Sequence, residues 1–353
     1  WIQPGTYVGA LDVVASTELL GLGPREDVVL DAANAAPVIS SVAPSLRLES
    51  LTLTGGRGEG GALSSLGASA ELQDVSVRFN ACGGSDQVAG VFAAGDLEIR
   101  ASEFVGNTCA AVSSGGAVAV DGGALLVAGS WFEDNAAVHG AAIDAEAAVG
   151  AVNISRSVFL NNVVGPRPVG GPAVVGGVVR VQGGAFVSNN HFAGNGGDAD
   201  AGGLLVTEPS AATLIAQNVF VDNVGALGGG LHVVLGAVPR GTIQGNIAAG
   251  NDGAGIWLEG VAPPVQCRFN DVWGNAVDWA GSAVLAPPAD NLSVDPSFVA
   301  WSLDGDPSND DFHLAVGSPL VDAGNPAAPW NDPDGSVNDP GLFGGPLGAW
   351  SGP

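Results

Sequence analysis

The sequence predicts an all-β fold, a right-handed parallel β-helix, and three features of the chain support this prediction. A phrase in which an aromatic or aliphatic residue is followed by two variable residues and Asn recurs between Ser102 and Asn275, with a degenerate copy from Val77. Successive copies are 27, 28, 27, 33, 28, 28 and 24 residues apart, a period typical of solenoid repeats. Apolar and polar residues alternate over short runs such as 124–132, as they do in strands. The 56 Gly residues and the absence of Lys and Met argue against a helical repeat.

A repeat of about 27 residues has room for three short strands and their turns, so we expect about eleven coils stacked roughly 4.8 Å apart. Equivalent residues of successive coils then form ladders. The expected interior aromatic column consists of Phe104, Phe132, Phe159, Phe192 and Phe220, continued by Val77, Ala248 and Val272. The expected ladder of Asn residues at a turn consists of Asn80, Asn107, Asn135, Asn162, Asn195, Asn223, Asn251 and Asn275. Asn tolerates left-handed backbone conformations, and its amide can bond to the coils above and below.

Gly-rich phrases such as 60–63 (GGAL) and 115–118 (GGAV) interleave with the Asn-containing phrase over residues 60–275. This combination resembles the repeats of the chlamydial polymorphic outer-membrane proteins and of related secreted bacterial β-helix proteins. The resemblance implies a bacterial protein that is exported and displayed at the surface, often as an adhesin. It implies no particular reaction.

The net charge of the chain is −26, from 36 acidic and 10 basic residues, and all ten basic residues are Arg. An acidic surface repels phosphate groups, so nucleic acid and anionic membranes are not expected partners. The sequence contains no apolar run of 18 residues, so we expect no transmembrane helix.

Two of the three cysteines occupy equivalent places in consecutive coils. Cys82 follows Asn80 by two positions and Cys109 follows Asn107 by two positions. Stacked residues lie at about the Cα separation that a disulfide accepts, and an exported protein would favour the bond. The alternative is a pair of small buried thiols, and Cys267 is expected to be a buried, inert thiol.

The chain begins with strand-like segments over 1–14, 16–32 and 43–58, followed by two more coils over 59–101. Residues 267–284 form the last recognisable coil. We therefore expect a parallel β-helix over 1–284 and a Pro-, Asp- and Gly-rich capping segment over 285–353 that packs on the same rod. Trp residues near the last coil are expected to cover the end of the core rather than to bind sugar.

Two loops frame a candidate ligand groove near residues 164–203. The longest step of the repeat places the loop 164–172, which carries Arg167, one coil before the acidic loop 194–203, which carries Asp198 and Asp200. Arg167, Asp198 and Asp200 are the ligand candidates of this groove. Solvated loop acids are the simpler interpretation of the two Asp residues.

The capping segment contains two Asp-rich stretches, 304–311 and 331–339, with closely spaced oxygen ligands of the kind that Ca²⁺ prefers. The candidate calcium ligands are Asp304, Asp306, Asp310, Asp332, Asp334 and Asp339. Neither stretch has the spacing of an EF-hand, and short Asp, Gly and Pro strings are also ordinary turn sequences.

The sequence contains no catalytic signature that we can assign. It lacks the residue sets of pectin hydrolases, and its four His residues are scattered. We therefore predict an exported protein of the bacterial surface or extracellular space, with a structural or adhesive role and no catalytic activity. Its expected partner is a surface glycan or protein, and self-assembly is a further possibility. The alternative is a carbohydrate-binding or polysaccharide-cleaving protein, a lyase or a hydrolase, that uses the groove near 164–203.

Overall fold

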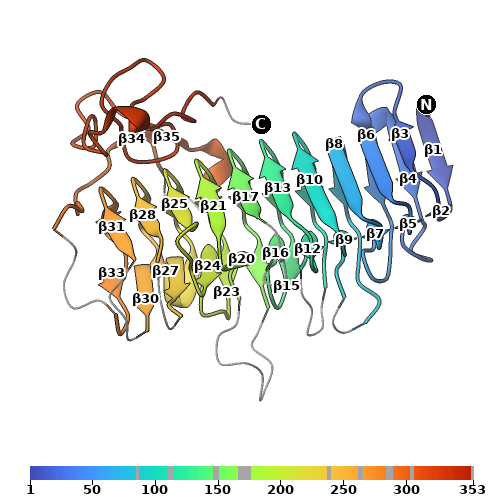
Figure 1. Ribbon diagram of the computed structural model, residues 1–353, viewed down its shortest axis with the longest axis horizontal. Helices are drawn as coiled ribbons and strands as arrows, with labels where there is room; N and C mark the ends of the chain where they lie inside the picture. The colour runs from blue at the N-terminus through green and yellow to red at the C-terminus, as the bar shows by residue number, and fades with distance from the viewer. Residues whose placement is uncertain are drawn as a thin grey trace. The chain divides into compact units, whose positions relative to one another are not determined.

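The computed structural model describes residues 1–84, 87–109, 115–145, 151–165, 176–236, 240–260, 265–283, 289–302 and 306–350. The chain forms two compact units. Unit 1 contains residues 1–152 and 162–180, and unit 2 contains residues 153–161 and 181–352. Both consist of parallel β-strands from successive coils, so the chain is an all-β parallel solenoid, as the sequence predicts (Figure 1).

Each coil of unit 1 contributes a strand to up to three faces. Face 1 contains β1 (Gly5–Val8), β4 (Val28–Asp31), the second half of β6 (Ser45–Thr54), the second half of β8 (Ser69–Arg78), β11 (Glu103–Val105) and β14 (Trp131–Glu133). Face 2 contains β2 (Leu11–Val13), β5 (Ile39–Ser41), β7 (Leu63–Ser65), β9 (Val91–Ala93), β12 (Val118–Val120) and β16 (Ile143–Ala145). Face 3 contains β3 (Thr17–Leu20), the first halves of β6 and β8, β10 (Asp96–Arg100) and β13 (Leu125–Ala128). The short strands β15 (Ala136–Ala137) and β19 (Val163–Val164) pair beside face 2.

Unit 2 repeats this arrangement. Its face 1 contains β18 (Val158–Leu160), β22 (His191–Ala193), β26 (Val219–Val221), β29 (Ile247–Ala249) and β32 (Asp271–Trp273). Its face 2 contains β23 (Gly196–Gly197), β24 (Leu204–Thr207), β27 (Val224–Val234), β30 (Asp252–Glu259) and β33 (Val277–Ala280). Its face 3 contains β21 (Ala185–Ser188), β25 (Leu214–Ala216), β28 (Thr242–Gln244) and β31 (Gln266–Arg268). The strands β17 (Val152–Ser155) and β20 (Val179–Gln182) contain residues of both units.

Side chains that point inward from equivalent strands stack to form the core of each unit. The rings of Phe104 and Phe132 stack in unit 1 with their centroids 4.8 Å apart. In unit 2, Phe192 stacks on Phe159 at 4.7 Å and on Phe220 at 4.8 Å. All five rings are fully buried. Such parallel stacking follows from the coil spacing, because in-register parallel strands place identical side chains above one another.

A ladder of Asn side chains runs along the corner between faces 1 and 2. The Nδ2 group of Asn107 donates to Asn135 Oδ1 at 2.9 Å, and the same contact repeats up and down each unit. Unit 1 brings together Asn80, Asn107, Asn135 and Asn162, and unit 2 brings together Asn195, Asn223, Asn251 and Asn275. The left-handed backbone of the turn belongs to the residue before each ladder Asn, such as Gly106 or Asp134, rather than to the Asn itself. The ladder Asn is thereby free to bond along the axis.

A second ladder of Asn side chains, which we did not predict from the sequence, lies at the corner between faces 3 and 1 of unit 2. It consists of Asn190, Asn218, Asn246, Asn270 and Asn291, with Nδ2–Oδ1 distances of 2.8 to 3.0 Å. In unit 1 the equivalent positions are Ser102 and Ser130, whose hydroxyls accept single backbone N–H bonds. The change of ladder is visible in the sequence. The residue two positions before each core Phe is Ser up to Ser157 and Asn from Asn190 onward.

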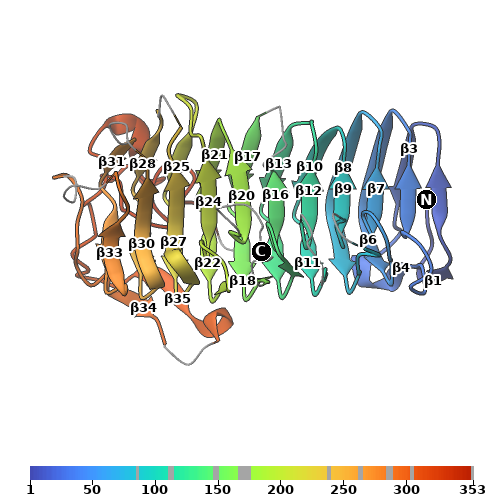
Figure 2. The same cartoon turned by 90° about the horizontal axis from the view of Figure 1, so that it is seen from below.

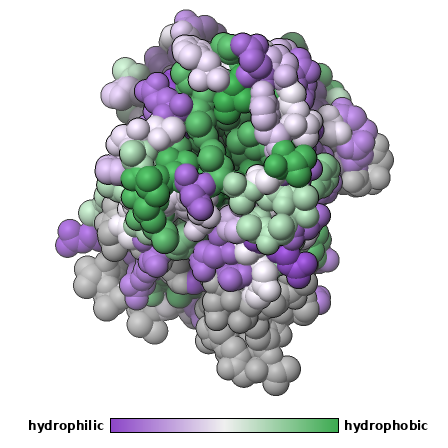
Figure 3. All heavy atoms as spheres, turned by 90° about the vertical axis from the view of Figure 1, so that its right-hand side faces the viewer, coloured by the Kyte–Doolittle hydropathy of each residue, from purple (hydrophilic) through white to green (hydrophobic). Residues whose placement is uncertain are grey.

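The first coil of unit 1 leaves apolar side chains in contact with solvent (Figure 3). Trp1, Val8 and Leu11 are exposed, and they line a cavity of about 480 Å³ together with Leu30 and Val38. In the described part of the chain β1, β2 and β3 each pair with a strand on one side only.

Residues 289–350 of unit 2 do not form further coils. They contain a two-stranded antiparallel sheet, β34 (Phe298–Ala300) with β35 (Asp311–Leu314), and the 3₁₀ turns η2 (Pro307–Asn309) and η3 (Ala328–Trp330). The segment first extends the last coil, because Leu292 bridges Asp271 and Asn291 ends the second ladder. It then lies along face 1 of unit 2 (Figures 1 and 2). Phe312 packs on His191, Gly341 N–H donates to Gly245 O at 2.7 Å, and Asn189 Nδ2 donates to Leu342 O at 2.9 Å.

Candidate ligand-binding site

The structure describes only part of the ligand groove that the sequence predicts near residues 164–203. Arg167 lies outside the described residues. Asp198 is exposed and Asp200 is half-buried, and the backbone carbonyl of Asp200 accepts the N–H groups of Leu227 and Gly228. These contacts hold the acidic loop against β27.

The acidic residues of the stretch 331–339 accept hydrogen bonds from backbone N–H groups, both within this stretch and from Asp322 and Gly345. Asp332 accepts the N–H groups of Gly345 at 2.5 Å and Asp339 at 3.1 Å. Asp334 accepts the Ser336 N–H, and Asp339 accepts the Asp322 N–H. Burial raises the pKa of the Asp332 and Asp339 carboxyls, and these N–H donors oppose the rise. The geometry is that of turns closed by carboxylates.

The other acidic stretch contributes to a cavity of about 340 Å³ in unit 2. Asp306 and Asp310 line it together with Asn161, Gly194 and Asp222, whereas Asp304 lies outside the described residues. Asp222 accepts a hydrogen bond from Trp301 Nε1 at 2.9 Å, and burial raises the pKa of its carboxyl. Across the described residues, no three His, Cys, Asp or Glu side chains are grouped as metal ligands.

The structure joins Cys82 and Cys109 in a disulfide between consecutive coils, with a Cα–Cα distance of 5.2 Å. Cys267 is a buried free thiol, and burial raises its pKa to about 12. A thiol that stays protonated is a poor nucleophile, so Cys267 contributes packing rather than chemistry.

A groove on face 1 of unit 1 combines an aromatic side chain with a fixed network of charges. Its volume is about 510 Å³, within the size range of small-ligand sites. We call it the Trp131 groove, and its lining residues are Arg25, Ala101, Ser102, Glu103, Val105, Gly129, Trp131 and Glu133. Because Glu103 pairs in register with Trp131, and Val105 with Glu133, the groove spans two coils.

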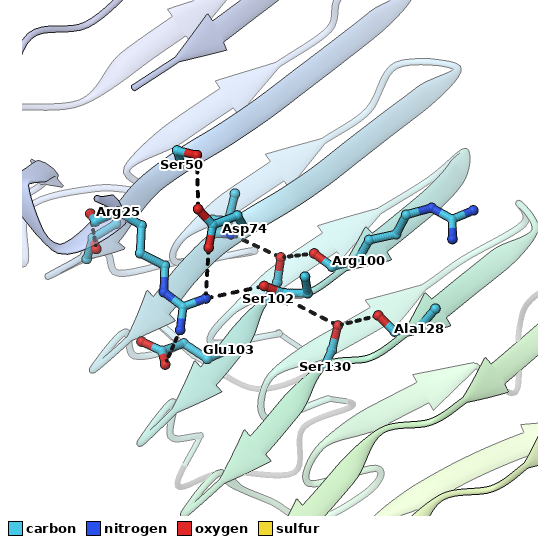
Figure 4. Close-up of polar contacts among 11 residues, drawn as sticks. Arg25, Ser50, Asp74, Arg100, Ser102, Glu103, Ala128 and Ser130 are labelled. Atoms are coloured by element: carbon cyan, nitrogen blue, oxygen red, sulfur yellow. Dashed lines mark hydrogen bonds and ion pairs between the residues drawn. The ribbon is translucent and has the colours of Figure 1, made fainter. Parts of the chain in front are cut away.

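Arg25 organises one side of the Trp131 groove (Figure 4). It belongs to the 3₁₀ turn η1 (Arg25–Asp27), which is fixed by a hydrogen bond of 2.9 Å from the buried Thr52 hydroxyl to the Arg25 carbonyl. Its guanidinium contacts Glu103 Oε2 at 2.7 Å, Asp74 Oδ1 at 3.3 Å and the Ala101 carbonyl at 3.3 Å. Three contacts, made with two consecutive coils, hold a long side chain in one position.

Trp131 and Glu133 form the other side of the groove. Trp131 Nε1 donates to Glu133 Oε2 at 3.0 Å, so the polar atom of the indole is satisfied and the half-buried ring is held in place. At the adjacent corner Gly129 has a φ of +58°, and an added Cβ would meet no atom within 4 Å. The space beside Trp131 is therefore open because residue 129 lacks a side chain.

The groove could not be predicted from the sequence, because Arg25 lies 78 residues before Glu103 and 49 before Asp74. Only the folded coils bring these residues together. One signal is present in the sequence: the residues that flank each core Phe point outward, and in 103–105 and 131–133 they are mainly charged or aromatic.

These observations define a parallel β-solenoid with a lateral groove. The family model "Right handed beta helix region" matches residues 89–272, more than half of the chain. The protein therefore belongs to the right-handed β-helix family, which also fixes the hand of its coils. No curated protein and no solved structure matches the chain. Of the described residues, none belongs to a helix with the length and apolarity needed to cross a membrane.

Proposed function

We propose that this protein is an exported bacterial β-helix that acts by adhesive binding rather than by catalysis, with the Trp131 groove as its contact site. The observation that carries the proposal is the open groove itself. A half-buried Trp beside the charged residues Glu103 and Glu133 offers apolar area to a partner, and the fixed charges around it lower the ordering cost of binding.

Export is supported by the disulfide between Cys82 and Cys109, because such bonds persist in oxidising compartments. The acidic chain, with a net charge of −26, fits a soluble surface protein whose partner is not an anionic polymer. A location on the outer cell surface or in the extracellular space is part of the same proposal.

Binding is favoured over catalysis by what the two carboxylates of the groove contact. A glycosidase needs one carboxylic acid as proton donor and one carboxylate as base or nucleophile. Glu103 accepts from Arg25 and Glu133 accepts from Trp131. Both are therefore arranged as hydrogen-bond acceptors.

The proposal is tested by screening the purified chain on arrays of glycans and surface proteins, with parallel assays of polysaccharide degradation. We expect binding without product formation, and loss of binding in Trp131→Ala. The control is Trp273→Ala, because Trp273 is also a half-buried Trp on face 1 but belongs to β32 of unit 2. Product formation that Glu133→Ala abolishes would instead identify a hydrolase.

The alternative site near 164–203 is tested in the same assays by Asp198→Ala combined with Asp200→Ala. Binding that this pair abolishes and Trp131→Ala spares would move the contact site there. Each assay is run with calcium and with EDTA, because a structural calcium ion in the stretch 304–311 or 331–339 also remains a proposal.

A further inference from the structure

We infer that the ligand of the Trp131 groove is a neutral glycan, bound by stacking on Trp131 and by hydrogen bonds to Glu103 and Glu133. This inference rests on the proposed binding function and specifies its ligand class. It follows from the aromatic surface, the free acceptors of the groove and the position of Arg25.

The Trp131 ring provides the apolar part of the contact. Its Nε1 is already bonded to Glu133, so a ligand meets the ring through dispersion and burial of area. A pyranose ring has a face of C–H groups that matches this surface, while its hydroxyls point outward. A purely apolar ligand would bury the charged groups beside Trp131 without hydrogen bonds, which is costly.

The two carboxylates provide acceptors for hydroxyl donors. Glu103 and Glu133 each use one oxygen internally, Oε2 in both cases, and their Oε1 atoms make no hydrogen bond within the described part of the chain. Carboxylates accept strong, charge-assisted hydrogen bonds from hydroxyl groups. The two groups lie on adjacent coils, so one ligand can contact both.

The charges of the groove select against ionic ligands. Among the lining residues the two carboxylates of Glu103 and Glu133 outnumber the single cation Arg25, so phosphate, sulfate and uronate groups are repelled. Cationic groups would be attracted to the Trp ring and the carboxylates. Arg25, however, already forms an ion pair of 2.7 Å with Glu103, so a positive charge is present in the groove and repels a second cation. A neutral polyhydroxyl ligand satisfies both constraints.

The test is calorimetric titration of the whole chain with three sets of probes: neutral oligosaccharides of glucose, galactose, mannose and N-acetylglucosamine, oligosaccharides of uronic acids, and Lys-containing peptides. We expect binding in the neutral set only, weakened about tenfold or more by Trp131→Ala. Trp131→Phe should recover part of the affinity, and Trp273→Ala should leave it unchanged. Melting temperatures and circular dichroism show whether each variant is folded.

Two variants separate the ligand classes. Glu133→Gln keeps a hydrogen-bond acceptor but removes the charge, so neutral glycan binding should fall by about threefold or less, whereas cation binding would fall by about tenfold or more. Arg25→Met removes the built-in cation, so Lys peptides should bind more tightly than to the parent chain. Trp131-dependent binding of uronates or of Lys peptides by the parent chain would overturn the inference and leave the proposed binding function standing. If no probe or array component shows Trp131-dependent binding, the proposed function of the groove fails as well.

Discussion

Face 1 is built on the same interior in both units, but its outer surface differs between them. In unit 1 the outward residues of β11 and β14 are half-buried, and three of the four are Glu103, Trp131 and Glu133. In unit 2 the outward residues of β18, β22, β26 and β29 are all buried and, His191 apart, are apolar. They are Val158, Leu160, His191, Ala193, Val219, Val221, Ile247 and Ala249. The segment 289–350 packs on this face, with Phe312 against His191 and Gly341 beside Ile247 and Val219. In this chain, the face with apolar outward residues is the one on which the tail packs, and the face with charged and aromatic outward residues stays open.

The corner between faces 3 and 1 differs in the same way. In unit 2 its left-handed residues Asn189, Gln217 and Gly245 bond to the segment 339–344. In unit 1 the equivalent Asp74 and Ala101 bond to Arg25. One corner is covered by a long segment and the other by a single side chain, which leaves room for the Trp131 groove.

Removing the tail should produce the largest effect. A chain that ends at residue 283 exposes the outward aliphatic side chains of unit 2, at a cost of about 1.5 kcal/mol or more for each large one. We expect hydrogen-exchange protection to collapse in β22, β26 and β29 while β11 and β14 keep theirs. Leu342→Ala, which truncates one buried side chain of the tail, should give a partial loss. Unchanged protection in β26 and β29 would show that the tail does not stabilise face 1.

We expect the second-largest effect on stability from the corner between faces 3 and 1, where unit 2 has a ladder of Asn and unit 1 has Ser. Asn218 donates to Asn246, Val187 and Ala216 and accepts from the backbone and side chain of Asn190. Asn218→Ala leaves several buried groups unpaired and should cost about 3 kcal/mol or more. Ser130 accepts one N–H and donates to Ala128 O, so Ser130→Ala should cost about 1 kcal/mol.

Hydrogen exchange of β25 and β28 for the first variant, and of β10 and β13 for the second, measures these losses within each unit. Asn218→Ser is the matched intermediate. Equal losses for Asn218→Ala and Ser130→Ala would mean that the Asn ladder adds no stability over single hydroxyls.

The interior was predictable from the sequence and the exterior was not, for a physical reason. Phe104 and Asn107 repeat because every coil repeats the same inward contacts, so the period alone predicts their columns. The parallel β-helix follows from the same period, and the family match fixes its right hand. Arg25 and Gly341 make their contacts once, with residues far away in sequence. A contact that occurs once in the chain produces no repeat that could be recognised in the sequence. The apolar outward residues of 219–221 and 247–249 do, however, indicate a covered face.

The first residue of a face 1 strand is acidic in both units, but it is paired with a cation in unit 1 and buried without one in unit 2. We expect this difference to have the smallest effect on stability. Glu103 begins β11 and is paired with Arg25, whereas Asp271 begins β32 and is fully buried. The pKa of Asp271 is raised to about 7, chiefly by burial, with the charges of Asp278 and Asp295 adding to the rise and the Val294 N–H opposing it. Its Oδ2 has no hydrogen-bond partner in the described residues.

Because the folded-state pKa of Asp271 lies above its ordinary value of 3.8, the protonated carboxyl supports the fold below about pH 4. That contribution is lost as the pH rises through about 7, since the unfolded chain ionises first. Asp271→Asn keeps an acceptor for Val294 and carries no charge. We expect it to raise the stability of unit 2 by about 1–2 kcal/mol at pH 8 and to make little difference at pH 4. Urea unfolding across this pH range, with the exposed Asp134→Asn as control, measures the difference. A gain that is the same at both pH values would show that Asp271 does not titrate within the fold, and that covering face 1 carries no ionic cost.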